Sequence, residues 1–240
     1  MSDAVPPSGQ PSGPRSVSVV LPVYRQADHI GLVVEEYLQA LARVPVPTQL
    51  LLAPNGPRDE THAACAELAR RHAGVELVDC PRAGWGAAVR AGLAAATGDL
   101  LCYTNSARTA PEDLVLLLLY ALAYPEVVVK ANRKVREGRL RRLGSLAYNL
   151  ECRALFDLSQ WDLNGTPKVF SRAAHPALLE LEREDDLIDL EFNVRCRREG
   201  YRMIEVPLFS SRRHGGKSTT NWRTALRLYS GALRLRQGEP

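Results

Sequence analysis

The sequence lacks long hydrophobic runs and any pairing pattern among its cysteines. Its longest apolar stretch, Leu114 to Tyr124, is far shorter than the roughly 20 residues that cross a bilayer, so we predict no membrane-spanning helix. The five cysteines never stand at C-x-x-C spacing, which argues against a disulfide framework and a structural zinc site. Residues 1–15 are rich in Pro, Ser and Gly without the apolar core of a signal peptide, and they predict a flexible tail on a cytoplasmic protein.

A strong charge imbalance is also missing, since 31 basic and 27 acidic residues give a net charge of +4. The charges are nevertheless clustered: basic residues crowd 133–142 and 195–236, and acidic residues crowd 180–191. A basic patch can bind nucleic acid, lipid headgroups or a phosphorylated small molecule. Because the basic stretches carry no aromatic-basic module and no recognition-helix pattern, we expect no nucleic-acid partner.

Short apolar runs alternate with segments of helical periodicity through the first half of the chain. This alternation predicts an α/β fold, a mainly parallel sheet flanked by helices on both faces. Ligands of such sheets bind at the carboxyl ends of the strands, so the turns 22–25, 54–59, 81–86 and 104–108 should surround one crevice. The expected strands are 16–23, 49–53, 75–79 and 100–104, and the expected helices are 30–43, 60–72 and 87–96.

The second half predicts further elements of the same domain, which we place at 16–221. Thr109 and Glu112 stand at capping-box spacing before the helix 114–124. The segment 222–240 should form an amphipathic helix and tail. Its apolar residues lie among arginines, so the helix either contacts a membrane surface peripherally, at the inner face, or packs on the domain. The other expected elements are strands at 127–130, 168–171 and 203–206 and helices at 140–155 and 187–198.

Six segments stand in an order that identifies a family. They are SVVLPVY from Ser18, NGPRDET from Asn55, GWGAAVRAGLAAATGDLL from Gly84, DLNGTPKVFSR from Asp162, DLEFNVRCRREGYRMIEVP from Asp189 and RRHGGKST from Arg212.

This order resembles the family 2 glycosyltransferases, which have a GT-A fold, and most closely the branch that includes dolichol-phosphate mannosyltransferase and bacterial polyprenyl-phosphate relatives. The resemblance covers about Ser16 to Asn221. It implies an enzyme that moves a sugar from a nucleotide-sugar donor to a polyprenyl-phosphate or small-molecule acceptor, with inversion.

The donor site is expected at the strand ends, where the resemblance adds Pro22 and Tyr24. Gly84 and Gly86 offer unblocked backbone N–H groups at a helix start, which suits a phosphate, although two glycines alone also fit a tight loop without a ligand. Asn55 and Asp59 could bind the base or ribose, and Asp59 could equally cap the helix that follows it.

The acceptor site is expected around two carboxylates and a set of basic residues. The resemblance implies that Asp189 first, and Glu191 second, faces the acceptor as a general base. Solvated acids at a helix start are the simpler interpretation, and an ionised phosphate acceptor needs no strong base. Four basic side chains are candidates for holding the diphosphate or the acceptor phosphate: Arg108, Lys168, Arg213 and Lys217. The loop that carries Arg213 and Lys217 could equally be a solvated basic loop without a ligand.

Acidic residues are scarce where the family has its metal-binding D-x-D element. That register falls on Thr104, Asn105 and Ser106, none of which is a carboxylate, and the earlier turn has Pro54 and Asn55 where two aspartates are usual. Mg²⁺ or Mn²⁺ prefers anionic oxygen ligands, so we predict no metal ligand in the protein, and an ion would be bound weakly unless the nucleotide's own phosphates hold it. Either cationic groups neutralise the leaving diphosphate, giving a transferase with weak or no metal dependence, or the chain is a non-catalytic nucleotide-sugar or glycolipid binding protein. We favour the transferase.

Overall fold

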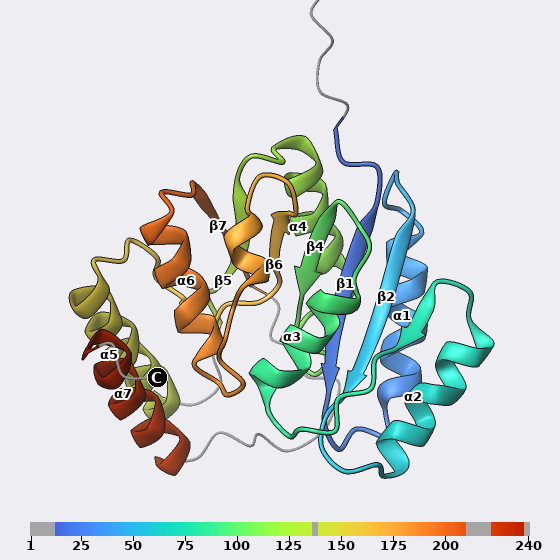
Figure 1. Cartoon of the computed structure of the whole chain (residues 1–240), viewed down its shortest axis with the longest axis horizontal. Coiled ribbons are helices and arrows are strands. Elements are labelled where there is room, and N and C mark those ends of the chain that lie inside the picture. The colour runs from blue at the N-terminus through green and yellow to red at the C-terminus, as the bar shows by residue number, and fades with distance from the viewer. Residues whose placement is uncertain (1–12, 136–138, 210–221, 238–240) are drawn as a thin grey trace, which may run out of the picture.

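The computed structural model describes residues 13–135, 139–209 and 222–237. In this part of the chain, seven strands form one sheet in the order β3-β2-β1-β4-β6-β5-β7, in which β6 alone runs antiparallel to its two neighbours (Figure 1). The predicted mainly parallel sheet is therefore confirmed. The strands are β1 (Val17–Val23), β2 (Thr48–Pro54), β3 (Val75–Leu77), β4 (Leu100–Tyr103), β5 (Val128–Arg133), β6 (Lys168–Ser171) and β7 (Met203–Leu208).

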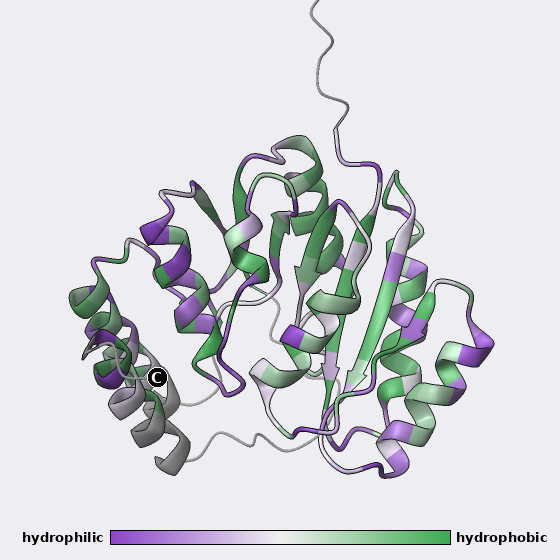
Figure 2. Ribbon diagram, viewed as in Figure 1, coloured by the Kyte–Doolittle hydropathy of each residue, from purple (hydrophilic) through white to green (hydrophobic). Residues whose placement is uncertain are grey.

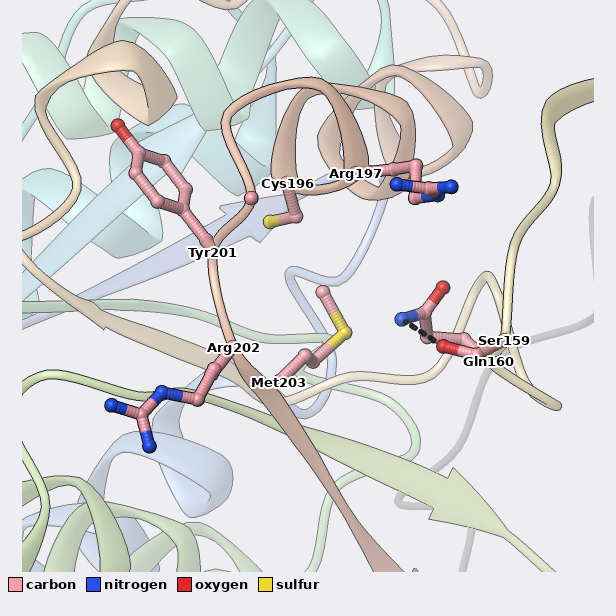
Figure 3. A pocket seen from close by; sticks show the side chains of 8 residues that line it. Ser159, Gln160, Cys196, Arg197, Tyr201, Arg202 and Met203 are labelled. Atoms are coloured by element: carbon pink, nitrogen blue, oxygen red, sulfur yellow. Dashed lines mark hydrogen bonds between the residues drawn. The ribbon is translucent and has the colours of Figure 1, made fainter.

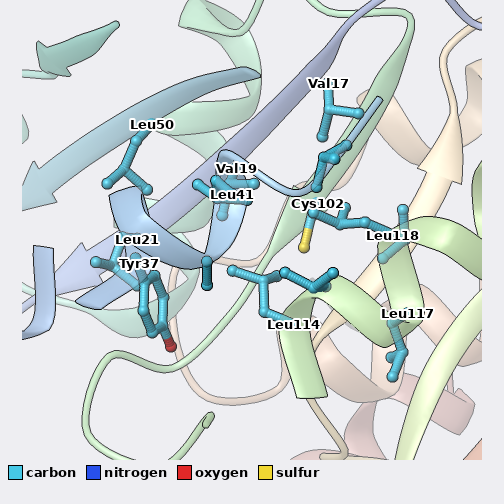
Figure 4. Packing of buried hydrophobic residues seen from close by; sticks show 14 of the residues in the cluster. Val17, Val19, Leu21, Tyr37, Leu41, Leu50, Cys102, Leu114, Leu117 and Leu118 are labelled. Atoms are coloured by element: carbon cyan, nitrogen blue, oxygen red, sulfur yellow. The ribbon is translucent and has the colours of Figure 1, made fainter. Parts of the chain in front are cut away.

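Helices cover both faces of the sheet because the strands bury side chains on both sides. In β1, Val19 and Leu21 pack under α1, α2 and α4, as Figure 4 shows for part of this cluster, whereas Val20 packs on the opposite face under α3 and α6. Alternating side chains of a strand point to opposite faces. The helices are α1 (Ile30–Leu41), α2 (Glu60–Arg71), α3 (Trp85–Ala95), α4 (Pro111–Ala123), α5 (Arg139–Phe156), α6 (Ile188–Arg198) and α7 (Trp222–Gln237).

The end of the chain adds a third cluster, in which α5, α6 and α7 pack together at the lower left of Figure 1. Ala232 is fully buried, and the Tyr229 hydroxyl donates a hydrogen bond to the Gly144 carbonyl at 2.9 Å. The buried side chains of α7 thus pack on the domain, whereas Leu233 is 47% exposed, and contact of the exposed side of α7 with a membrane stays a prediction. No helix among the described residues is both long and apolar enough to cross a membrane.

The expected capping box before α4 is wrong. The helix begins at Pro111 with Ala110 as its N-cap and no side-chain cap, and the Thr109 hydroxyl instead shares a 2.7 Å hydrogen bond with the Thr104 hydroxyl. Proline at the first helical position has no N–H, which removes one of the groups that a cap would satisfy. Figure 2 shows the hydrophobic pattern on which the predicted strands and helices rest: the strands are mainly hydrophobic, and the outer helices carry both hydrophobic and hydrophilic residues.

Candidate active site

The carboxyl ends of β1, β2 and β4 lie side by side where the sequence predicts the crevice, and one side chain links several of these segments. Asn55 follows β2. Its Nδ2 donates to the Val23 carbonyl at 3.0 Å, and its Oδ1 accepts from the N–H of Gly84 at 3.1 Å. Asn55 therefore joins the end of β1, the end of β2 and the start of α3, three segments that the sequence predicted to meet here.

Gly84 and Gly86 have a packing role that the sequence did not reveal. A Cβ atom added at Gly84 would lie 2.3 Å from the Glu184 carbonyl oxygen, and one at Gly86 would lie 2.4 Å from that of Arg183. The N–H of Ala87 donates to the same Glu184 oxygen at 2.9 Å. The glycines thus make room for a neighbouring loop. The amide of Gly84 is not unblocked, contrary to expectation, and phosphate binding at this helix start stays a prediction.

The turn in the D-x-D register is closed by neutral hydrogen bonds. Thr104 pairs with Thr109, the Ser106 hydroxyl donates to Gln26 Oε1 at 2.6 Å, and Asn105 Oδ1 accepts from the backbone N–H two residues later at 3.0 Å. All three side-chain oxygens are uncharged and already engaged. Across the described residues, moreover, no three His, Cys, Asp or Glu side chains gather in a way that could hold a metal ion. These residues do not fit Mg²⁺ or Mn²⁺.

The first two turns hold the remaining donor-site candidates. Tyr24 is 39% exposed, and the exposed guanidinium of Arg25 lies 5.3 Å from the centre of its ring. Pro22, by contrast, is buried inside β1 beside Ala53. Asp59 caps α2, since its Oδ1 accepts from the backbone N–H groups of the next turn at 2.9 and 3.2 Å. Contact of Pro22, Tyr24 or Asp59 with a nucleotide stays a prediction.

Asp189 is held by two buried partners beneath the crevice. The Tyr103 hydroxyl donates to Asp189 Oδ1 at 3.1 Å, and the Lys168 ammonium forms an ion pair with the same oxygen. Antiparallel pairing of β6 with β4 sets Lys168 opposite Tyr103. Lys168 is fully buried and Asp189 is 6% exposed. Burial lowers the pKa of Lys168, and the charge of Asp189 opposes that shift. Lys168 therefore has its partner inside the protein, and its contact with a ligand stays a prediction.

Glu191 anchors the loop that packs on α3. Its two carboxylate oxygens accept hydrogen bonds from the backbone N–H groups of Glu182, at 2.9 and 3.1 Å, and Arg183, at 2.9 Å. The next residue, Glu184, supplies the carbonyl that meets Ala87. Asp189 and Glu191 thus both support the crevice wall from the first turn of α6. Whether either carboxylate faces the acceptor stays a prediction.

Sequence reasoning missed a buried ionic network beside this pair. Arg133, at the end of β5, donates from Nε and Nη2 to the two oxygens of Asp162 at 2.8 and 3.0 Å. Lys130 is fully buried and donates to the Asp162 carbonyl at 2.5 Å and to Glu205 Oε1 at 3.4 Å. One feature of the sequence could have revealed this network, because Lys130 is a charged residue inside the apolar run VVVKA and would need a buried partner. Burial first, and the charge of Lys168 second, lower the pKa of Lys130 to about 8.

The lowered pKa of Lys130 predicts a pH dependence of stability. The folded state binds the Lys130 proton less tightly than the unfolded state, whose pKa is about 10.4, so between these values the unfolded chain holds more protons and the free energy of unfolding rises with pH. Relative to Lys130→Met, the wild type should gain about 1–3 kcal/mol between pH 7.5 and pH 10, at roughly 1.4 kcal/mol per unit of pKa shift. Urea unfolding at both pH values measures this, and the prediction is contradicted if the free energy of unfolding of the wild type, minus that of Lys130→Met, stays constant or falls between pH 7.5 and pH 10.

Two basic candidates, Arg213 and Lys217, lie outside the described residues, so their roles stay predictions. A separate pocket of about 290 Å³ lies at the other end of the sheet, between the end of α6 and the start of β7, and Arg197, Tyr201 and Arg202 contribute to its lining (Figure 3). It adjoins the amino end of β7, whereas the crevice lies at carboxyl ends. We therefore keep it apart from the candidate active site.

Comparison with known proteins decides the family. The model of glycosyl transferase family 2 matches residues 18–177, which include the crevice wall from β1 to β4. The chain belongs to glycosyl transferase family 2. The fold of this family 2 chain is GT-A, and the prediction of a glycosyltransferase-family protein is confirmed.

Its relatives and structural neighbours agree. Over 210 residues it is 26% identical to the undecaprenyl-phosphate 4-deoxy-4-formamido-L-arabinose transferase of Pectobacterium atrosepticum, covering 85% of this chain and 62% of the relative. The chain thus spans less than two thirds of that protein. It is 28% identical to an uncharacterised glycosyltransferase of Mycobacterium bovis, over 85% of this chain and 88% of that one. Glucosyl-3-phosphoglycerate synthase of Mycobacterium tuberculosis, solved with phosphoglyceric acid, aligns with a TM-score of 0.70 at 22% identity, over 94% of this chain and 81% of that one.

Proposed function

We propose that the chain transfers a sugar from a nucleotide-sugar donor to a polyprenyl phosphate. The observation that carries this proposal is the family 2 match over residues 18–177, the segment that includes β1, β2 and β4. The name of the Pectobacterium relative supports undecaprenyl phosphate as the class of acceptor. A phosphate acceptor also suits the surroundings of Asp189, because an ionised phosphate needs no general base and this carboxylate is already engaged by Lys168 and Tyr103.

In this mechanism an oxygen of the acceptor phosphate attacks the anomeric carbon, and the nucleoside diphosphate leaves from the opposite side, which inverts the configuration. The attacking oxygen is already ionised, so no side chain has to remove a proton. The role that remains for the protein is to position both substrates and to stabilise the charge that develops on the diphosphate. We assign Asp189 and Glu191 to positioning, because each is engaged in holding the crevice wall.

Weak or absent metal dependence is part of the proposal, and it rests on the neutral, engaged oxygens of Thr104, Asn105 and Ser106. Basic side chains near the crevice would then carry the electrostatic role. Arg25 and Arg108 are the described candidates, and Arg213 and Lys217 are the candidates from the sequence.

The test is the release of nucleoside diphosphate from UDP-, GDP-, CDP- and dTDP-sugars with polyprenyl phosphate in detergent, with either EDTA or Mn²⁺. We expect turnover of one donor class at nearly the same rate in both. A metal that stabilised the transition state would contribute several kcal/mol, so its removal would slow the reaction by about 100-fold or more. A loss of that size with EDTA would contradict metal independence and leave the transferase itself in place.

A non-catalytic binding protein is the second candidate, favoured by the same missing carboxylates. It predicts a rise in melting temperature with a nucleotide sugar, because a ligand that binds only the native state stabilises it, together with no diphosphate release from any donor. Thermal shift and turnover measured on one protein sample separate the two functions.

A further inference from the structure

Helix α5 presents an apolar surface to solvent. From residue 143 to its end at Phe156, the part of the helix whose burial the structure describes, every exposed position is apolar. Leu143 is 62% exposed, Leu146 46% and Leu150 50%. The other exposed positions are Gly144, Ala147 and Ala154.

These residues lie on one face of the helix, separate from the face that packs on the protein. Positions three, four and seven apart share a helix face, which places Leu143, Leu146 and Leu150 in one row that we call the leucine face. Tyr148 and Cys152 occupy another side of α5 and are buried against α6 and α7. The domain therefore has its own packing surface on α5, and the leucine face remains unpartnered among the described residues. Adjacent exposed leucines of this kind indicate an interaction surface.

Basic residues precede the leucine face in the sequence of α5 and stand on the neighbouring α7, and the acidic Asp157 that follows α5 is paired with Arg197. The sequence places three arginines, at 139, 141 and 142, in the first turn of α5, and no acidic residue stands there. On α7, which packs beside α5, Leu233 is 47% exposed and is followed by exposed Arg234 and Arg236. The one acidic residue of α5, Glu151, is half-buried, and burial raises its pKa. An apolar helix face with basic residues around it is typical of a helix that lies on anionic lipid.

The position of α5 relates this surface to the crevice. In Figure 1, β1 and β2 point downward, so their carboxyl ends and the crevice lie at the lower edge of the sheet, and α5 and α7 lie at the lower left. We propose that the leucine face of α5 rests on a bilayer surface that contains anionic lipids, with the crevice turned toward the same surface. The inference deepens the proposed function, on which it rests, because a polyprenyl phosphate is presented from a bilayer.

Vesicle cosedimentation of the full chain tests this proposal without donor or acceptor. The vesicles are phosphatidylcholine alone or with phosphatidylglycerol, at low and high salt. We expect binding to the anionic vesicles that weakens with salt, and at least about tenfold weaker binding for the triple variant Leu143→Gln, Leu146→Gln, Leu150→Gln, because the loss scales with the apolar area removed.

The matched control is Leu116→Gln with Leu119→Gln on α4, where both leucines are 41% exposed and acidic residues begin the helix. It should bind vesicles like the wild type. Both variants alter exposed positions, so melting temperatures near that of the wild type establish that they fold. Equal vesicle binding by the triple variant, or none by the wild type, would overturn the proposal.

Light scattering tests whether a second copy of the chain, rather than lipid, occupies the leucine face. If the wild type is a dimer and the triple variant a monomer, a second copy of the chain covers the leucines and the lipid proposal fails. An assay of sugar transfer to a water-soluble short-chain acceptor phosphate distinguishes failure of the lipid proposal from failure of the proposed function, because this acceptor needs no bilayer. The triple variant should retain that transfer, and absence of transfer in the wild type would count against the transferase alone.

Discussion

Lys168→Met is expected to lower the free energy of unfolding by about 3–5 kcal/mol, the cost of removing one partner from a buried ion pair. The substitution keeps the length and apolar stem of the side chain but leaves Asp189, only 6% exposed, with the Tyr103 hydroxyl as its remaining described donor. The carboxylate of the variant stays buried without its cationic partner, and an unpaired buried charge costs several kcal/mol. Urea unfolding measures the change in midpoint.

Two controls give this result its meaning. The double variant Lys168→Met, Asp189→Leu should recover most of the loss, since an apolar pair can replace a buried ion pair at little cost. Arg197→Met breaks the exposed ion pair between Arg197, whose side chain is 58% exposed, and Asp157, whose side chain is 86% exposed. This variant should move the midpoint little. If Lys168→Met unfolds at the wild-type midpoint, Lys168 is not committed to Asp189, and the sequence-based prediction that it contacts a ligand gains support.

The fold was predictable because its signals are local. Alternating β-branched runs and helical periods mark each strand and helix within about ten residues, and the rule that ligands sit at carboxyl ends then places the turns after β1, β2 and β4 together. Asn55 illustrates this success. Its position at a strand end was enough to predict that it would lie near the end of β1 and the start of α3, and its hydrogen bonds to Val23 and Gly84 join these segments.

The partners inside the candidate site were not predictable, because they are far apart in the sequence. Lys130 and Glu205 meet only because β5 pairs with β7, and no local pattern predicts that pairing. Asp59 shows the same limit, since a residue at the end of a turn can bind a ligand or cap a helix, and only its geometry distinguishes the two. The antiparallel direction of β6, which sets Lys168 opposite Tyr103, is likewise a property of the whole sheet.

Gly86→Ala is expected to destabilise the free protein by about 1–3 kcal/mol, the usual cost of inserting an atom into a filled space. The added Cβ would lie 2.4 Å from the Arg183 carbonyl oxygen and 2.7 Å from that of Asp185. Both are backbone atoms, so a side-chain rotation cannot relieve the contact. The loop cannot retreat freely either, because Glu191 holds the N–H of Arg183 at 2.9 Å.

The same variant separates the two roles considered for the glycines of α3. Alanine keeps the backbone N–H, so a glycine needed only for phosphate approach would leave the melting temperature of the ligand-free protein unchanged and lower donor affinity alone. Close packing against the loop predicts a lower melting temperature before any ligand is added. Gly31→Ala is the matched control, since a Cβ there meets nothing within 4 Å, and alanine in a helix should add about 0.5–1 kcal/mol of stability. A stable Gly86→Ala protein would show that the 183–185 loop does not press on α3, and the crevice wall would lose the support assigned to Glu191.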